Sequence, residues 1–290
     1  MNAAGRTSGR ATPAQALRLL QAEHRIKFRK SLGQHFLVDP RALDGIVRAL
    51  DPRPGEVVVE VGSGAGFLTE RLLETKARVI AVEIDPAMAD LLDRRLGSSS
   101  ALAIVRGDIL KTDLGATLRS AGASECRVVG NLPYQITTPV LFRFLGERDR
   151  VTRMVFTVQR EVGIRMAAGP GSKDYGALSV AVAYASRCES LFAIAPASFV
   201  PRPQVRSVVV RLDPLPRRLA AAAEARLFSV VRAAFGQRRK MLVNSVAEVA
   251  GGKDAARAIL ARAGLDETRR GETLSLAEFE RLAATASGAG

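Results

Sequence analysis

An alternation of apolar runs with helical segments, beginning near residue 54, is the feature that most constrains the fold. Five runs have the composition of buried strands, at residues 56–62, 78–85, 102–109, 126–132 and 153–159. The segments "GFLTERLLE" and "PAMADLLDRRL" between the first of them have the spacing of amphipathic helices. Two later strand-like runs, 178–186 and 206–212, lie close together and predict an antiparallel edge. Together these runs predict a mostly parallel seven-stranded sheet covered by helices on both faces.

A change in composition after residue 213 indicates a second, smaller domain. The segment "DPLPRR" (213–218) carries two prolines, and the chain beyond it is rich in alanine, leucine and arginine without a strand pattern. There, "LAAAAEARLFSVVRAAFGQRRK" predicts a helix that ends near Gly236, and "SLAEFERLAA" predicts a final helix capped at Ser275. We expect a Rossmann-like α/β domain over 25–213 and an all-helical domain over 214–290.

The first 22 residues contain Arg6, Arg10 and Arg18 and no acidic residue. That composition is shared by organellar transit peptides and by basic tails. Thr12 and Pro13 predict the start of a short helix, "TPAQALRLLQAE". We therefore favour a basic extension with a short helix over residues 1–24.

The charge of the chain indicates a polyanionic partner. Lysine and arginine exceed aspartate and glutamate enough to give a formal net charge of +14. Nucleic acid is the commonest partner of such a protein, and a membrane surface or solubility alone are the alternatives. No run approaches the roughly 18 apolar residues of a membrane span, so none is expected.

Cysteine and histidine are too few for several kinds of site. Cys126 and Cys188 lie far apart in apolar runs, which predicts buried, reduced thiols in a reducing compartment such as the cytoplasm. His24 and His35 are the only histidines, so we expect no structural zinc site and no Ser-His-Asp triad. Nothing in the sequence indicates an oligomer, and we expect a monomer.

A glycine-rich turn, "EVGSGAGF" (60–67), follows the first strand. Ligands of open parallel sheets bind beyond the carboxyl ends of the strands, and glycines there let a cofactor approach the backbone. Gly62 and Gly64 are therefore candidates for cofactor contact. A tight turn without a ligand, or a dinucleotide site, would have a similar pattern.

Acidic residues at the ends of the next two strands favour a nucleoside cofactor. Glu83 lies about 20 residues past the glycines, where a carboxylate can accept both hydroxyls of a ribose. Asp108 in "RGDI" is placed to accept a hydrogen bond from an adenine amino group, with Ile84 and Ile109 on either side of the ring. Each acid alone would suit a surface turn equally well, but three consecutive strand ends with suitable groups favour a site.

The spacing of the glycines favours S-adenosylmethionine over a dinucleotide. In G-x-G-x-G the third glycine comes one residue too early for the dinucleotide pattern, and Glu60 precedes the glycines within the strand. A cofactor with a cationic centre and no phosphate suits an acidic pocket mouth better than a pyrophosphate does.

The run "GNLPYQI" (130–136) follows the fourth strand and combines an amide, a rigid turn and an aromatic ring. The Asn131 amide oxygen and the Leu132 carbonyl would accept the N–H groups of an exocyclic adenine amine and favour the geometry of attack. Pro133 would fix the turn, and the base would stack on Tyr134. The alternative is a structural loop after a strand.

Eight segments along the chain carry a resemblance to a known family. In order, they are "KSLGQHFL", "EVGSGAG", "VEID", "GDIL", "GNLPYQITTP", "PGSKDYGALSV", "SFVPRPQVRSVVVRL" and "FGQRRKMLVNS". Together they resemble the ribosomal small-subunit RNA adenine dimethyltransferase family. The resemblance implies a class I methyltransferase fold with S-adenosylmethionine as cofactor and a helical C-terminal domain. It implies N6,N6-dimethylation of two adjacent adenines near the 3′ end of small-subunit ribosomal RNA during late subunit assembly.

The resemblance also implies site residues. Those expected to line the cofactor site are His35, Leu37, Gly62, Glu83, Asp108 and Asn131. Tyr134 and Phe199 would clamp the extruded base from its two faces. The family often has asparagine where this chain has His35, whose backbone can make the same contact.

Two further expectations concern the substrate side. Because it lies between prolines, Phe199 is predicted to be rigid and exposed, and a buried anchor for its loop is the alternative. The cations after the predicted helix near Gly236 are expected to meet either that helix dipole or RNA phosphates. The predicted RNA contacts, in the helical domain and around the site, are Lys30, Lys173, Arg202, Arg238, Arg239 and Lys240.

Three alternatives remain beside the small-subunit enzyme. A large-subunit RNA methyltransferase of the erythromycin-resistance type shares the fold and a similar Asn-Pro-Tyr motif, and a DNA N6-adenine methyltransferase would share the grip on the amine. The segments "PGSKDYGALSV" and "FGQRRKMLVNS" favour the small-subunit family. A ribosome-assembly factor that acts mainly by binding is the third, and intact Glu83, Asp108 and Asn131 disfavour a loss of catalysis.

Overall fold

The computed structural model describes residues 13–24, 33–237 and 239–286. The chain divides into two compact units, each made of several segments. Unit 1 takes Met1–Thr137, Arg153–Gln159 and Leu191–Arg211, and unit 2 takes Thr138–Thr152, Arg160–Ser190 and Leu212–Gly290. Because each unit combines several segments of the chain, this division does not test the domain boundaries expected at residues 24 and 213, which stay a prediction.

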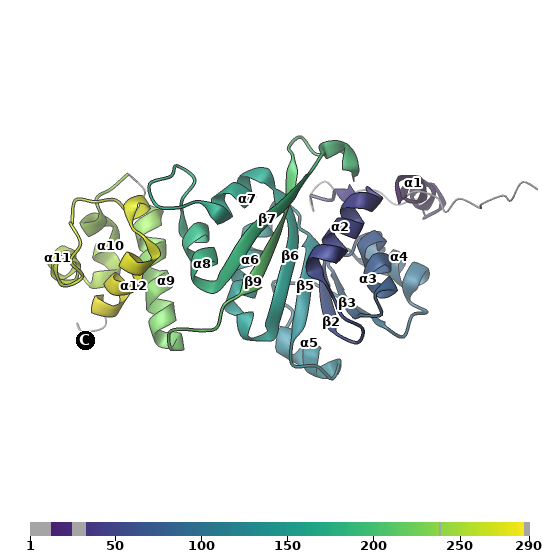
Figure 1. The fold of residues 1–290 in the computed structure, drawn as a ribbon, viewed down its shortest axis with the longest axis horizontal. Helices are drawn as coiled ribbons and strands as arrows, with labels where there is room; N and C mark the ends of the chain where they lie inside the picture. Colours follow the sequence, from purple (N-terminus) through teal and green to yellow (C-terminus); the bar gives the residue numbers. More distant parts are fainter. Residues whose placement is uncertain (1–12, 25–32, 238, 287–290) are drawn as a thin grey trace, which may run out of the picture. The chain divides into compact units, whose positions relative to one another are not determined.

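The central sheet has seven strands in the order β4-β3-β2-β5-β6-β9-β7 (Figure 1). They are β2 (Val57–Val61), β3 (Arg78–Glu83), β4 (Leu102–Arg106), β5 (Cys126–Asn131), β6 (Val151–Gln159), β7 (Ser186–Ile194) and β9 (Ser207–Pro214). The pairs β2–β3, β2–β5 and β3–β4 are parallel. Every residue of β2 is buried, which is why this strand reads as an almost continuous run of valine.

The predicted strand over 178–186 is wrong, because this run forms helix α8 (Ala177–Ala185). Nearly all of its residues are buried, so it shows no amphipathic period. A short apolar run of that kind cannot be told from a buried strand by periodicity alone. The seventh strand is instead the next and more polar segment, β7, which lies at an edge of the sheet and is partly exposed. The other six predicted strands are confirmed.

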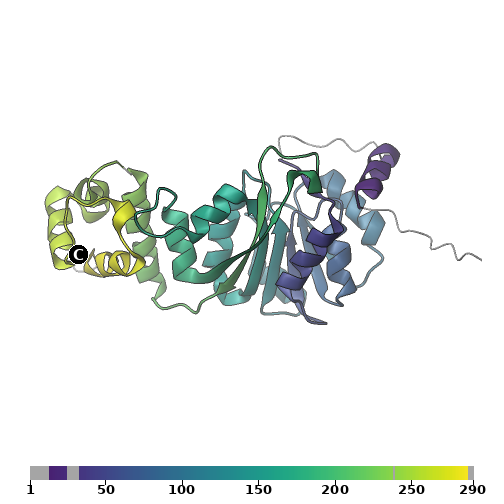
Figure 2. The ribbon, with the colours of Figure 1, turned by 45° about the horizontal axis from the view of Figure 1, so that its top comes forward.

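Four helices of unit 1 flank the parallel strands in sequence, one before β2 and one after each of β2, β3 and β4. They are α2 (Pro40–Leu50), α3 (Phe67–Glu74), α4 (Pro86–Leu96) and α5 (Leu114–Ser120). Each of α2, α4 and α5 is capped by an aspartate whose side chain accepts hydrogen bonds from backbone N–H groups of the first turn. These aspartates are Asp39, Asp85 and Asp113. Figure 2 shows α2 lying across the strands. Apolar side chains of α2, α3 and these strands form one core.

An N-terminal helix and a two-stranded sheet also belong to unit 1. The N-terminal helix α1 (Pro13–His24) begins at Pro13 as predicted, whereas the expected cap, Thr12, lies outside the described residues. Leu17 of α1 is buried in the same core. Strands β1 (Phe36–Leu37) and β8 (Phe199–Val200), the latter after the 3-10 turn η3 (Pro196–Ser198), pair antiparallel with Leu37 opposite Phe199.

The helices of unit 2 come from two parts of the chain. They are α6 (Thr137–Gly146), α7 (Arg160–Ala167), α8, α9 (Ala221–Gly236), α10 (Leu242–Ala250), α11 (Lys253–Arg262) and α12 (Leu276–Thr285), with 3-10 turns η2 (Arg148–Arg150) and η4 (Gly271–Thr273). The helix predicted to end near Gly236 is confirmed as α9. Ser275 caps α12 as predicted, in a reciprocal pair of hydrogen bonds with Glu278.

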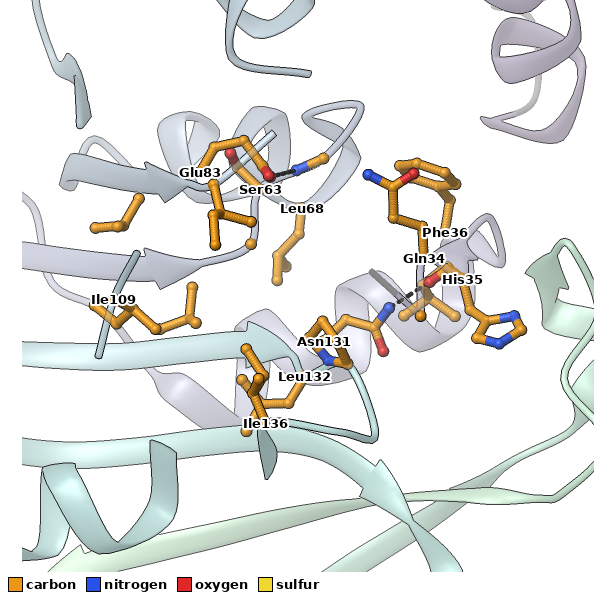
Figure 3. A pocket seen from close by; sticks show the side chains of 18 of the residues that line it. Gln34, His35, Phe36, Ser63, Leu68, Glu83, Ile109, Asn131, Leu132 and Ile136 are labelled. Carbon is orange, nitrogen blue, oxygen red and sulfur yellow. Dashed lines mark hydrogen bonds between the residues drawn. The ribbon is translucent and has the colours of Figure 1, made fainter. Parts of the chain in front are cut away.

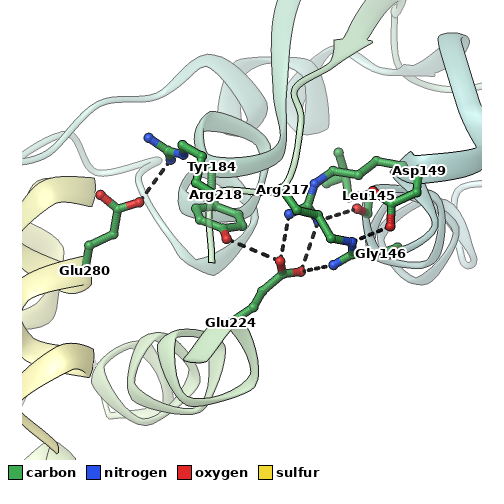
Figure 4. Close-up of polar contacts among 9 residues, drawn as sticks. Leu145, Gly146, Asp149, Tyr184, Arg217, Arg218, Glu224 and Glu280 are labelled. Atoms are coloured by element: carbon green, nitrogen blue, oxygen red, sulfur yellow. Dashed lines mark hydrogen bonds and ion pairs between the residues drawn. The ribbon is translucent and has the colours of Figure 1, made fainter. Parts of the chain in front are cut away.

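A buried ion network in unit 2 joins α9 to α8 and η2 (Figure 4). Both guanidinium Nη atoms of Arg148 donate to the Glu224 carboxylate, at 3.0 and 2.7 Å. Arg217 donates to the same carboxylate at 2.8 Å, and the Tyr184 hydroxyl donates to it at 3.2 Å. These contacts explain why helices before residue 213 belong to the same compact unit as the C-terminal helices.

Two expectations from composition can be compared with the structure. Neither Cys126 nor Cys188 is in a disulfide; Cys126 is buried as predicted, whereas Cys188 is only half-buried. Within the described part of the chain, none of the helices has the length and apolar character needed to cross a membrane.

Candidate active site

The glycine-rich turn between β2 and α3 uses three left-handed backbone conformations. Gly62, Gly64 and Gly66 have φ angles of +70°, +52° and +78°. A Cβ on Gly64 would lie 2.8 Å from the Phe36 ring, and one on Gly66 would lie 2.6 Å from Leu92. A Cβ on Gly62 would meet nothing within 4 Å. The second and third glycines are thus required by packing, while the first faces open space in the cavity.

Glu83 ends β3 and lies against this turn. Its Oε2 accepts the Gly64 N–H at 2.8 Å, and its Oε1 accepts the Asp85 N–H at 2.8 Å. Burial raises the pKa of the carboxyl, although hydrogen bonds from the backbone of Asp85, Gly64 and Ile84 act in the opposite direction. The carboxylate has about four acceptor sites and so retains capacity for a further donor, and the residue lines the cavity.

Glu60 differs from the expectation for an acidic pocket mouth. Its side chain is buried in β2 and accepts the Thr69 hydroxyl at 2.5 Å, and it is not part of the cavity wall. Burial, opposed by the Thr69 hydrogen bond and aided by the nearby charge of Glu83, raises the pKa of Glu60 to about 7. The prediction fails because strand residues alternate between faces, and this side chain points into the core.

Asp108 and Ile109 follow β4 at the same edge of the sheet. The Asp108 Oδ1 accepts the Leu110 N–H at 2.9 Å, which fixes the carboxylate at the turn. Ile109 is buried and Ile84 is half exposed, and both line the cavity with Asp108. The structure therefore brings the three predicted strand ends together around one cavity.

Asn131 is the last residue of β5 and lines the same cavity, apart from Glu83 (Figure 3). Its Nδ2 donates to the His35 carbonyl at 2.6 Å, so the amide is oriented and Oδ1 remains as an acceptor. The following turn is closed by the Pro133 carbonyl, which accepts the Ile136 N–H at 3.1 Å and the Thr137 hydroxyl at 3.0 Å. Leu132, also in the cavity wall, is buried.

Tyr134 and His35 form a stacked pair at the cavity. Their ring centroids are 5.6 Å apart, with 29° between the planes. The Tyr134 hydroxyl lies 3.4 Å from Ser207 Oγ, and His35 Nδ1 lies 2.8 Å from the Pro201 carbonyl oxygen. Leu37, two residues further along β1, is buried and lines the same cavity.

Phe199 lines the cavity but is not exposed as predicted. Only 3% of its surface is accessible, because β8 pairs with β1 and the ring joins the core of unit 1. The alternative of a buried aromatic anchor is therefore the correct description of its environment. Two prolines indicated rigidity but carried no information on burial.

Four of the six predicted RNA contacts fall within the described residues. Lys30 and Arg238 fall outside the described residues. The other four are exposed, and none lines the cavity: Lys173, Arg202, Arg239 and Lys240. Their contact with RNA stays a prediction.

Three site residues were not found from the sequence. Gln34 lies beside His35, and its Nε2 donates to Asp85 Oδ2 at 2.9 Å, tying the start of β1 to the end of β3. The signal that could have indicated Gln34 is its position in "GQHFL", next to the predicted site residues His35 and Leu37. Ser63 lies between the first two glycines, and its buried Oγ has no hydrogen-bond partner among the described residues. Ser207, the partner of Tyr134, is brought there by β9 and had no local signal.

The cavity fits a small polar cofactor of the kind that the sequence predicts. The unpartnered Ser63 hydroxyl and the open space at Gly62 lie where the glycine turn meets the cavity. Glu83 and Asp108 supply acceptors, and Ile84 and Ile109 supply apolar surface, all from unit 1.

Sequence comparison identifies the family. The model of the ribosomal RNA adenine dimethylase family matches residues 25–283. The chain belongs to the ribosomal RNA adenine dimethylase family. Among its relatives are proteins named "Ribosomal RNA small subunit methyltransferase A". The one from Alkaliphilus oremlandii is 40% identical, over 94% of this chain and 96% of its own. The one from Geobacter sulfurreducens is 44% identical, over 89% and 94%.

Solved structures support the fold of this adenine dimethylase. A dimethyladenosine transferase from Plasmodium falciparum matches with a TM-score of 0.69 at 23% identity, covering 84% of this chain and 94% of its own. The 23S rRNA methyltransferase ErmE matches with a TM-score of 0.64 at 24% identity, covering 87% and 99%. The predicted class I methyltransferase fold is confirmed. As a family member, the chain is an S-adenosylmethionine-dependent adenine dimethyltransferase that acts on ribosomal RNA.

Proposed function

We propose that this enzyme methylates the N6 amines of two adjacent adenines near the 3′ end of small-subunit ribosomal RNA. The product is N6,N6-dimethyladenine, formed on the assembling small subunit at a late stage. The names of relatives that are 40–44% identical over most of both chains support the choice of the small subunit. We place the enzyme in the cytoplasm and expect it to act as a monomer.

The residues around the glycine turn would hold the cofactor. Glu83 would accept the ribose hydroxyls, and Asp108 would accept the adenine amine between Ile84 and Ile109. Gly62 and Gly64 would let the cofactor approach the backbone, with the main chain of His35 and the Leu37 side chain closing the site. Bound S-adenosylmethionine supplies an electrophilic methyl group on a sulfonium.

The orientation of Asn131 is the observation that carries the proposal. Because its Nδ2 is used by the His35 carbonyl, Oδ1 is held as an acceptor in the cavity wall. An adenine amine is a weak nucleophile, since its lone pair is delocalised into the ring. Acceptance of its two N–H groups by Asn131 Oδ1 and the Leu132 carbonyl would favour the geometry for attack. The cationic product then loses a proton to solvent.

Aromatic stacking would stabilise the extruded base. We assign one face of the adenine to Tyr134 and the other to Phe199, whose buried ring already lies in the cavity wall. Stacking on an aromatic side chain contributes about 1–3 kcal/mol per base, enough to offset much of the cost of unstacking. Phosphate contacts are assigned to the exposed cations Lys173, Arg202, Arg239 and Lys240, and to Lys30 and Arg238.

Methyl transfer to defined substrates tests the function. Labelled S-adenosylmethionine is supplied with undermethylated small ribosomal subunits, large-subunit RNA or duplex DNA, and the nucleosides are analysed by mass. We expect N6,N6-dimethyladenosine in the small-subunit sample alone. The variant Asn131→Ala should abolish transfer while retaining RNA affinity, and an equal loss of both would contradict its assigned role.

Other outcomes of this experiment would support one of the three alternative functions. Label in large-subunit RNA would favour an enzyme of the erythromycin-resistance type, and label in duplex DNA would favour a DNA methyltransferase. Tight binding to small subunits with no label in any sample would favour an assembly factor that acts by binding.

A further inference from the structure

The His35 side chain has no part in the chemistry assigned above. Its backbone carbonyl holds Asn131, and any residue could supply that carbonyl. Figure 3 shows the His35 ring on the far side of Asn131 from Glu83 and Ile109. The imidazole therefore lies away from the residues assigned to the ribose and adenine of the cofactor, on the substrate side of the cavity.

Two contacts hold the imidazole. Nδ1 lies 2.8 Å from the Pro201 carbonyl oxygen, which can only accept, so Nδ1 carries a proton. One ring face stacks on Tyr134. Pro201 directly follows β8, the strand that carries Phe199. The His35 side chain thus joins the turn after β5 to the segment after β8.

The Tyr134 ring is restrained at two places. Its hydroxyl lies 3.4 Å from Ser207 Oγ, and one face stacks on the imidazole, so that a base would stack on the other face. A ring that is immobilised before binding loses less conformational entropy when a ligand stacks on it.

We propose that the His35 side chain is a positioning residue for the target adenine: it immobilises the Tyr134 ring and so sets the affinity for RNA without affecting the cofactor. This role rests on the proposed stacking of the base on Tyr134. His35 acts through that ring and touches none of the reacting atoms.

Steady-state methyl transfer to undermethylated small subunits tests this role. Loss of one aromatic contact and one hydrogen bond in His35→Ala should raise KM for the subunit about tenfold and change kcat by less than about threefold. Affinity of the RNA-free protein for S-adenosylmethionine, measured by calorimetry, should stay within about twofold, since the backbone carbonyl remains. His35→Phe keeps a stacking ring and should recover most of the loss. An unchanged KM in His35→Ala, or a loss of cofactor affinity as large as the rise in KM, would overturn the proposal.

A double-mutant cycle distinguishes the role of His35 from the proposed stacking of the base on Tyr134, on which that role depends. If His35 acts through Tyr134, the double variant with Tyr134→Ala should have the KM of Tyr134→Ala alone. Full additivity would overturn the role of His35 and leave base stacking intact. A native KM in Tyr134→Ala would overturn base stacking, and the role of His35 with it. Circular dichroism checks that each variant folds, and His35→Phe provides the comparison if His35→Ala does not.

Discussion

At the scale of single residues, Glu60 and Glu83 show how burial changes a carboxylate beside the glycine turn. Burial raises the pKa of both, and that of Glu60 rises to about 7 from an ordinary value of 4.5. The folded state therefore binds the Glu60 proton more tightly than the unfolded chain does. The stability that this carboxyl contributes is fully present below about pH 4.5, falls as the pH rises to about 7, and is constant above that.

The variant Glu60→Gln tests this pH dependence. The neutral amide can still accept the Thr69 hydroxyl and removes the buried charge, so we expect a gain of about 2 kcal/mol at pH 8 and little change at pH 5. Thermal unfolding midpoints of the native and variant proteins across this range provide the measurement. Glu125→Gln, which removes a carboxyl of an exposed residue, is the matched control. A difference from the native protein that does not vary with pH would contradict the assignment.

At the scale of elements, Glu224 of α9 is the shared acceptor of the network in unit 2. Burial alone would raise its pKa, but hydrogen bonds from Arg148 and Arg217 more than reverse this and lower it. The stability contributed by Glu224 is therefore present above its ordinary pKa of 4.5 and lost as the pH falls through the lowered value. Arg148 and Glu224 are almost inaccessible, so neither is well solvated without its partner.

Replacement of Glu224 by glutamine should destabilise unit 2. Removing one partner of a buried ion pair leaves an uncompensated guanidinium, which costs about 3–5 kcal/mol. Glu280→Gln is the matched control, because Glu280 pairs with Arg218 at 3.0 Å in a more exposed position and should cost less than about 1 kcal/mol. Urea unfolding of both variants at pH 7 gives the comparison. Equal losses in the two would show that the buried network does not hold α9 in place.

At the scale of the whole molecule, the net charge of +14 is the property that matters for the substrate. Ribosomal RNA carries one negative charge per phosphate, and neutralising several phosphates releases bound counterions. The binding constant then falls as the salt concentration rises. The slope of its logarithm against the logarithm of the salt concentration is proportional to the number of phosphates that are neutralised.

RNA affinity should fall steeply with salt. If about four phosphates are neutralised, the logarithm of the binding constant should decrease with a slope of about −3 against the logarithm of salt concentration. The change Lys240→Gln should reduce that slope by about 1 if Lys240 contacts a phosphate. Lys253→Gln, an equal change of charge at an exposed position outside the predicted contacts, should leave it nearly unchanged. Filter binding over a salt series measures all three slopes, and a flat response would refute the electrostatic contribution.

Elements with a local sequence signal could be predicted without the fold. Strands of continuous valine, the glycine turn, the helix start at Pro13, the cap at Ser275 and the polar residues at strand ends all depend on a few neighbouring residues. Because parallel strands bring their carboxyl ends to one edge, Glu83, Asp108 and Asn131 could be placed together before any coordinates were known.

Features that depend on burial could not be predicted in this way, because they are set by packing. A run such as 178–186 is apolar all round, and only its packing made it helix α8 rather than a strand. The same holds for Glu60 and Phe199, which the sequence placed at a surface and the fold placed in the core. The orientation of Asn131 by a carbonyl 96 residues away, and the contact of His35 with Pro201, exist only once β1 and β8 have paired. Burial and such long-range contacts are properties of the assembled core, and no short window of sequence contains them.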